Sequence, residues 1–237
     1  MDQAVSEFVD YKLADGVATM IMDDGKANAF GVGMTTALSA GLDCAKDEAE
    51  VVVIQGKPGL FCAGFDLKII NGPKEGVLEM VTAGAELALK TYLHPQPVII
   101  GCTGHAVAAG ALFLCAADYR IGVLGEFKIG LNETSIGLSL PTWGLELARD
   151  RLDNRMLTRA TLGSELYAPL QAAEVGYLDE VVDLDKFPAR LVEKATEYQN
   201  LGGSAYGLVK RRLRMARETL IRSGMAAELA ARSDSGV

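Results

Sequence analysis

The stretch PVIIGCTGHAVAAGALFLCAADYRI, residues 97–121, decides the fold class of this sequence. Its first part, residues 97–104, is a short apolar run typical of a buried strand. Residues 108–119 are apolar on every side, which predicts a short helix at the centre of the molecule. YRIGV, residues 119–123, predicts a further strand. A strand, a buried helix and a strand in succession favour an α/β fold.

The same alternation extends toward the N-terminus. Residues 8–23 contain two short strand patterns around Asp15-Gly16, a residue pair typical of hairpin turns. Residues 51–56, VVVIQG, predict a buried strand, and apolar residues recur at helical spacing over 34–44 and 75–93. From about residue 144, helical and charge-rich patterns dominate. We therefore predict an α/β core followed by a C-terminal helical part.

Composition excludes several classes of function. The net charge of −8 over 237 residues argues against a broad nucleic-acid surface. No apolar run reaches ~18 residues, so no membrane span is predicted. The N-terminal residues include acids and no apolar segment of the kind found in secretory signals. The four cysteines show no C-x-x-C or metal-type spacing, and we interpret them as buried thiols of a cytoplasmic protein without a metal site.

Two glycine- and alanine-rich stretches are candidates for binding an oxygen atom. In FCAGFDL, residues 61–67, the small residues Ala63 and Gly64 would let a ligand approach the backbone closely. A plain turn with Asp66 capping the next helix explains the same pattern. The helix that begins near residues 108–110 would expose free N–H groups, and losing one such oxyanion donor typically costs about 2.7–4 kcal/mol. Close helix–strand packing is the alternative reason for these small residues.

A single carboxylate, Glu133, lies in the stretch IGLNETSIGLSLP, residues 129–141. Apolar surroundings disfavour the charged form of a carboxyl group and raise its pKa, which suits proton transfer near neutral pH. The alternative is a solvent-facing or helix-capping glutamate, because polar residues flank this position on both sides. On these residues alone, a catalytic role for Glu133 stays a hypothesis.

Together, AGFDL at 63–67, the block 97–121 and the stretch 129–141 resemble the crotonase family, also called the enoyl-CoA hydratase/isomerase superfamily. The resemblance covers nearly the whole chain. It implies an α/β fold in which a crotonase-type spiral of ββα units, residues 1–185, precedes a C-terminal helical trimerisation region, residues 186–237. It also implies homotrimers or dimers of trimers, although the short C-terminal end weighs against hexamers.

The resemblance further implies binding of acyl-CoA thioesters in fatty-acid β-oxidation, with no separate cofactor because CoA is part of the substrate. The backbone N–H groups of Phe65 and Ala109 would form the oxyanion hole, with alanine standing where the family usually has glycine. The implied substrate and CoA contacts are Lys26, Ala27, Ala29, Ala63, Gly64, Asp66, Leu67 and Leu112.

Basic residues supply further candidates. Lys26, Lys57 and Lys68 could meet the CoA phosphates. So could the basic segment KRRLR, residues 210–214, for which a solvated helix face is the alternative interpretation. His105, Cys62 and Cys115 are interpreted as structural residues, since the family has no catalytic histidine in this block.

Leu112 departs from the family pattern in an informative way. Hydratases of the family carry a glutamate at this position and a second one at the position of Glu133, and the pair holds the water that is added. With leucine at 112, the resemblance favours a Δ3,Δ2-enoyl-CoA isomerase in which Glu133 alone shuttles a proton. The alternatives are enoyl-CoA hydration, another enolate chemistry such as hydrolysis or decarboxylation, and a non-catalytic acyl-CoA-binding protein.

Overall fold

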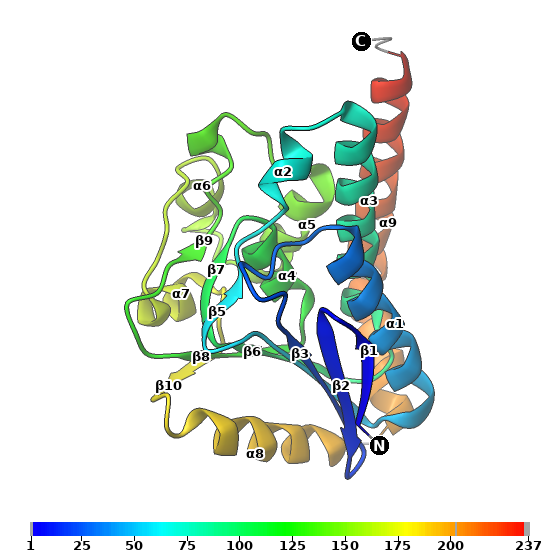
Figure 1. Cartoon of the computed structure of the whole chain (residues 1–237), viewed down its shortest axis with the longest axis vertical. Coiled ribbons are helices and arrows are strands. Elements are labelled where there is room, and N and C mark those ends of the chain that lie inside the picture. The colour runs from blue at the N-terminus through cyan, green and yellow to red at the C-terminus, as the bar shows by residue number, and fades with distance from the viewer. Residues whose placement is uncertain (1, 202, 235–237) are drawn as a thin grey trace.

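The computed structural model describes residues 2–201 and 203–234, and places ten strands there in two sheets (Figure 1). The larger sheet has seven strands in the order β1-β2-β3-β4-β6-β8-β10, and the smaller has three in the order β5-β7-β9. The strands of the larger sheet are β1 (Asp2–Ser6), β2 (Val9–Ala14), β3 (Val17–Met22), β4 (Val51–Gln55), β6 (Val98–Cys102), β8 (Tyr119–Val123) and β10 (Glu180–Val182). Those of the smaller sheet are β5 (Gly59–Cys62), β7 (Gly104–Val107) and β9 (Ile129–Gly130).

The helices lie between and around these strands. They are α1 (Val32–Glu48), α2 (Leu67–Ile70), α3 (Lys74–Leu93), α4 (Ala109–Ala116), α5 (Thr142–Arg151), α6 (Leu157–Thr161), α7 (Pro169–Val175), α8 (Phe187–Gln199) and α9 (Gly203–Asp234). A short 3₁₀ helix covers Thr134–Ile136. The predicted hairpin is confirmed, because β2 and β3 pair antiparallel around Asp15 and Gly16, which both have positive φ.

The chain repeats one structural unit three times. Each unit gives a strand to the larger sheet, then a strand to the smaller sheet, and then turns into helix: β4–β5–α2, β6–β7–α4 and β8–β9–α5. Neighbouring strands from successive units are parallel in both sheets. The predicted α/β fold with a spiral of ββα units is therefore confirmed.

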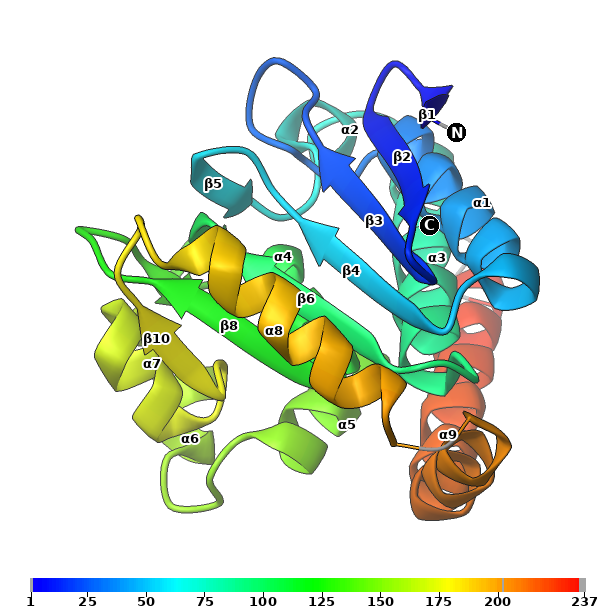
Figure 2. The same cartoon turned by 90° about the horizontal axis from the view of Figure 1, so that it is seen from below.

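Helix α4 forms the centre of the core. All eight of its residues are buried, as its uniformly apolar sequence predicts. Burying a leucine or phenylalanine side chain contributes about 1.5–3 kcal/mol, and α4 supplies Leu112, Phe113 and Leu114. Helix α8 lies across the opposite face of the larger sheet (Figure 2), where Phe187 and Leu191 pack on Val53 and Ile99.

Helix α9 is attached to the core by buried charges. Lys210 Nζ lies 2.5 Å from Asp118 Oδ2, and Arg214 Nη2 lies 2.9 Å from Asp118 Oδ1. All three side chains are about 95% buried. Lys210 and Arg214 of the KRRLR segment are buried in the protein, so both interpretations of the segment, a phosphate contact and a solvated face, are wrong for these two residues. Residues 211–213 of the segment are exposed.

Some sequence-based expectations fail. The short strands β5, β7 and β9 were not predicted, since two to four residues carry no readable alternation. Cys44 lies exposed on α1, so the prediction of buried thiols is wrong for it, whereas Cys62, Cys102 and Cys115 are buried.

The described residues also bear on the predictions on membranes and metals. Among the described helices, none is long and apolar enough to cross a membrane. The same residues contain no cluster of three or more His, Cys, Asp or Glu side chains suited to a metal ion. The division near residue 185 stays a prediction.

Candidate active site

Three candidate groups follow the three parallel strands of the smaller sheet. Phe65 comes soon after β5, Ala109 directly starts the helix after β7, and Glu133 follows β9. The carboxyl ends of parallel strands meet at one edge of a sheet, which is where α/β proteins commonly bind ligands. Repetition of the ββα unit thus brings together residues that are far apart in the chain.

The loop carrying Phe65 lies against the start of α4. A Cβ atom at Gly64 would be 2.9 Å from the Cβ of Ala108 and 3.5 Å from the backbone N of Ala109. Gly64 also has a φ of +97°, so glycine is required twice over at this position. The ring of Phe65 packs on α3, where a Cβ at Gly84 would come within 2.6 Å of it.

The backbone N–H groups of Phe65 and Ala109 are the candidate oxyanion donors. Neither donates to a protein oxygen among the described residues. The first N–H groups of a helix lack intrahelical partners, which explains the free donor at Ala109. Ala108 precedes it with a φ of +54°, a conformation that costs an alanine of order 1–3 kcal/mol. Its own N–H donates to the carbonyl oxygen of Gly130 over 3.0 Å, which holds this strained turn against β9.

Glu133 is a shielded carboxylate. Its exposed fraction is 8%, and its Oε2 atom is buried without a hydrogen-bond donor. Burial raises the pKa of Glu133, and hydrogen bonds from the backbone N–H groups of residues 132 and 133 lower it by less. Its side chain caps no helix, and it does not face solvent. Neither alternative interpretation of Glu133, as a helix-capping or as a solvent-facing glutamate, therefore applies.

Phe65, Leu112 and Glu133 line one pocket of about 270 Å³. Its remaining wall is formed mostly by apolar side chains: Ile70, Val77, Val81, Leu138, Ser139, Leu140, Pro141 and Glu228. The lining thus comes from the loops after the strands of the smaller sheet, from α3 and from the C-terminal helix α9. Glu228 of α9 was not among the predicted residues, and no local motif marks it. Its carboxylate Oε1 accepts hydrogen bonds from Thr142 N (2.7 Å) and Thr142 Oγ1 (2.5 Å).

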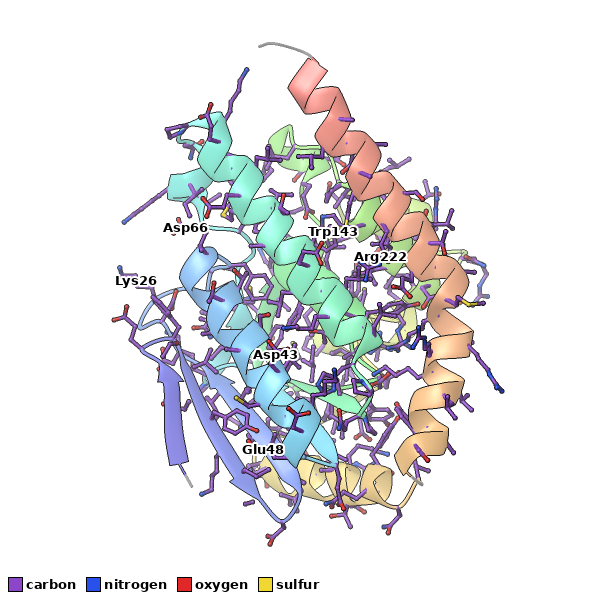
Figure 3. The ribbon with its side chains drawn as sticks, turned by 90° about the vertical axis from the view of Figure 1, so that its right-hand side faces the viewer. Lys26, Asp43, Glu48, Asp66, Trp143 and Arg222 are labelled. Carbon is purple, nitrogen blue, oxygen red and sulfur yellow. The ribbon has the colours of Figure 1, made fainter. Side chains whose placement is uncertain are left out.

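The loop of residues 23–30 lies beside the loop of residues 61–66. Ala63 N donates to Ala27 O over 3.1 Å, and Phe30 N donates to Gly64 O over 2.8 Å. The structure thus brings Lys26, Ala27 and Ala29 next to the implied CoA-contact loop. Figure 3 shows Lys26 and Asp66 at the same end of the molecule, where α1 begins.

The candidate phosphate ligands differ in their surroundings. Lys26 and Lys68 are exposed, whereas Lys57 forms an ion pair with Asp23 over 2.9 Å. Asp66 caps α2 by accepting from the backbone N of Lys68, as its alternative interpretation predicts. Leu67 follows it with 63% of its surface exposed. The predicted contacts of these residues with substrate stay predictions.

His105 has a structural environment. Its Nδ1 atom accepts from the backbone N of Lys128 over 3.0 Å, and its ring stacks edge-on against Phe127. It lines none of the pocket described above.

A family model described as enoyl-CoA hydratase/isomerase matches residues 12–234. The chain belongs to this family. A Mycobacterium tuberculosis protein is described in one solved structure as an enoyl-CoA isomerase and in another as a probable enoyl-CoA hydratase. The first of these structures is 35% identical in sequence, with a TM-score of 0.89, over 94% of this chain and 97% of that one. Rat mitochondrial enoyl-CoA delta isomerase 1 is 27% identical over 85% of this chain and 71% of its own length.

The names of the relatives do not all state one reaction. A protein of Rhodobacter capsulatus named a probable enoyl-CoA hydratase is 28% identical over 85% of this chain and 79% of its own length. Identity to the rat isomerase and to this hydratase is thus nearly equal. Membership of the enoyl-CoA hydratase/isomerase family shows that the protein is an enzyme of that superfamily. The choice between isomerisation and hydration depends on the residues that line the pocket.

Proposed function

We propose that this protein is a Δ3,Δ2-enoyl-CoA isomerase. The observation that carries the proposal is the pairing of a buried glutamate with a buried leucine in one pocket. Glu133 supplies a carboxylate of raised pKa, and Leu112, with 1% of its surface exposed, stands where a hydratase of the family has its other glutamate. One carboxylate suffices to move a proton, whereas adding water requires groups that hold the water.

The reaction needs three protein groups. Glu133 removes a proton from C2 of a 3-enoyl-CoA thioester, and the electron pair of the broken C–H bond delocalises into a dienolate. The N–H groups of Phe65 and Ala109 donate to the thioester oxygen, where the negative charge develops. Glu133 then returns the proton to C4, and the double bond lies between C2 and C3. Atoms and electrons balance without a further reactant, and the proposal includes no separate cofactor.

The second carboxylate of the pocket has a different environment from Glu133. Both hydrogen bonds to Glu228 Oε1 come from Thr142, so this oxygen is already occupied by two donors, whereas Glu133 Oε2 has none. We therefore assign proton transfer to Glu133 alone. Hydration remains the competing reaction because of the hydratase-named relative.

The test compares two reactions in the same preparation. Formation of the 2-enoyl thioester from trans-3-hexenoyl-CoA is followed beside hydration of crotonyl-CoA, in the native protein and in Glu133→Gln. We expect isomerisation without comparable hydration, and its loss in the variant. Glu126→Gln is the matched control, since this glutamate is exposed on the connection between β8 and β9. Hydration as fast as isomerisation would overturn the assignment, and binding without either activity would favour a binding protein.

CoA recognition is the second part of the proposal. The two adjoining loops, residues 23–30 and 61–66, would contact the nucleotide through their backbone, and the exposed Lys26 and Lys68 would meet its phosphates. Lys26→Ala and Lys68→Ala are then expected to raise KM with little change in kcat, because a phosphate contact is equal in the ground and transition states. Lys57 is less suited, since Asp23 already pairs with it.

The assembly is proposed to be a homotrimer, singly or paired. Helix α9 supports self-association, because Val209, Leu213 and Leu220 on it are 63%, 78% and 52% exposed in the single chain. Exposed apolar patches of this kind mark interfaces. Light scattering on the eluting protein measures the mass, and Leu213→Glu should reduce it. The cytoplasmic location stays a prediction.

A further inference from the structure

A second, largely apolar pocket lies directly behind the reaction pocket. It has a volume of about 280 Å³ and is lined by residues of α3, α5 and α9. Its lining includes Leu78, Ala85, Trp143 and Met225, with Arg222 and Glu86 at its rim. Figure 3 shows Trp143 and Arg222 between α3 and α9, the two long helices that form its walls.

The two pockets share two residues, Val81 of α3 and Glu228 of α9. These side chains therefore form the partition between the reaction pocket and the second pocket. Val81 is half-buried and apolar, whereas Glu228 brings a carboxylate to an otherwise apolar boundary. An alkyl chain that crosses this boundary has to displace the carboxylate or strip it of water, and both are unfavourable.

The partition is fixed in place by a helix terminus. Helix α5 begins after Pro141 and has no side-chain cap of its own and no acidic residue in its first turn. The carboxylate of Glu228, on α9, supplies both the cap and the acidic group. It accepts hydrogen bonds from the backbone N–H and the hydroxyl of Thr142, in the first turn of α5. Rotating Glu228 out of the boundary would leave these donors unpaired, so the closed arrangement is the favoured one.

We propose that Glu228 is a specificity-determining residue that ends the acyl pocket and makes the enzyme prefer short acyl chains. The inference rests on the proposed acyl-CoA substrate, but not on the isomerase reaction. Removing the partition from either side joins the two pockets into one continuous apolar channel. Longer acyl chains then bind more tightly, since burying one methylene strengthens binding roughly fourfold.

The experiment measures binding rather than turnover. Dissociation constants are determined by calorimetry for butanoyl-, octanoyl-, dodecanoyl- and hexadecanoyl-CoA, which are saturated and cannot be isomerised. The proteins are the native form, Glu228→Ala, Val81→Ala and Glu86→Ala. Val81→Ala opens the partition without removing the cap on α5, and Glu86→Ala removes a rim carboxylate without opening the partition.

In the native protein and in Glu86→Ala, we expect affinity to stop rising with chain length after the shorter thioesters. In Glu228→Ala and Val81→Ala it should continue to rise, with a gain of at least about tenfold for dodecanoyl-CoA and none for butanoyl-CoA. Profiles of the same shape in all four proteins would overturn the inference, as would an equal gain in Glu86→Ala. A native protein that binds no acyl-CoA overturns the proposed substrate as well, whereas absent isomerase activity with the expected binding profile refutes only the reaction.

Discussion

Leu112 and Gly144 are in contact across the α4–α5 interface so closely that a Cβ atom at Gly144 would lie 2.6 Å from Leu112 Cδ1. This contact holds the leucine at the wall of the pocket that Glu133 also lines. The packing of α5 against Leu112 thus fixes an apolar side chain at this part of the pocket wall.

Gly144→Ala should destabilise the protein by about 1–3 kcal/mol, because the added methyl group overpacks a filled contact and pushes Leu112 toward the pocket. Isomerase activity should fall with it. Gly76→Ala is the matched control in α3, where the nearest atom to an added Cβ, Ile69 Cγ2, lies 3.8 Å away. Urea denaturation measures both variants. Equal stability of the two would contradict the proposed contact.

The isomerase rate should fall at acidic pH with an apparent pKa above the ordinary glutamate value of 4.5, because burial raises the pKa of Glu133 and the base must be ionised. A profile of kcat/KM against pH measures it. An acidic limb at or below 4.5 would exclude Glu133 as the base in the free enzyme.

Glu133→Gln should stabilise the protein at neutral pH. The folded state binds the glutamate proton more tightly than the unfolded state, so ionisation of Glu133 destabilises the fold fully above its raised pKa and not at all below about 4.5. The gain in the free energy of unfolding should therefore disappear in acid. Denaturation at two pH values tests this, and a pH-independent gain would point to a packing effect instead.

Ala108→Gly should raise the melting temperature slightly or leave it unchanged. Relief of the positive φ is worth about 1–3 kcal/mol, and the greater freedom of glycine in the unfolded chain offsets about 0.4–1 kcal/mol of it. Ala106→Gly, in β7 with ordinary backbone angles, should be destabilising. A clear loss of stability in Ala108→Gly would show that the methyl group contributes packing that outweighs the strain.

Asp118→Asn should cost about 3–5 kcal/mol, since it leaves Lys210 and Arg214 buried without their counter-charge. Burial lowers the pKa of Lys210 to about 8 even with Asp118 beside it. Between about 8 and the ordinary 10.5, the unfolded state binds more protons at Lys210 than the folded state, so this contribution to stability increases with pH. Asp183→Asn, in an exposed pair with Lys186, should leave the unfolding midpoint unchanged. A similarly small effect at Asp118 would mean that α9 is held by its apolar contacts.

A thiol reagent should modify one cysteine in the native protein. Cys44 is exposed, whereas burial raises the pKa of Cys62 and Cys102 to about 12 and that of Cys115 to about 11. The thiolate is the reactive form, so the three buried groups should react only after unfolding. Counting modified thiols by mass spectrometry, with Cys44→Ser as control, measures this. Rapid labelling of a second cysteine would indicate local opening of the core.

The fold was predictable where residues carry a periodic signal. Helix α4 is apolar on all sides, and the Asp15-Gly16 turn specifies its hairpin by local chemistry. Glu133 and the loop around Gly64 could be selected because each lies in a motif. The smaller sheet has strands too short to show alternation, so the edge that gathers these groups is visible only in three dimensions.

Glu228 shows why the rest was not predictable. It lies 86 residues after Thr142, in a helix whose sequence around it contains ordinary charged and small residues. Its place at the pocket depends on how α9 packs across α3 and α5, and a tertiary contact of this length leaves no pattern in either segment. Lys210 and Arg214 were misjudged for the same reason, since their partner Asp118 is in the core.

The capping of α5 by Glu228 bears on when the pocket around Glu133 is completed during synthesis of the chain. Synthesis proceeds from the N-terminus, so Phe65, Ala109 and Glu133 leave the ribosome before α9 does. Until α9 docks, the reaction pocket lacks one wall and the first N–H groups of α5 remain solvated. The pocket around Glu133 therefore gains the wall that contains Glu228 only when α9 docks.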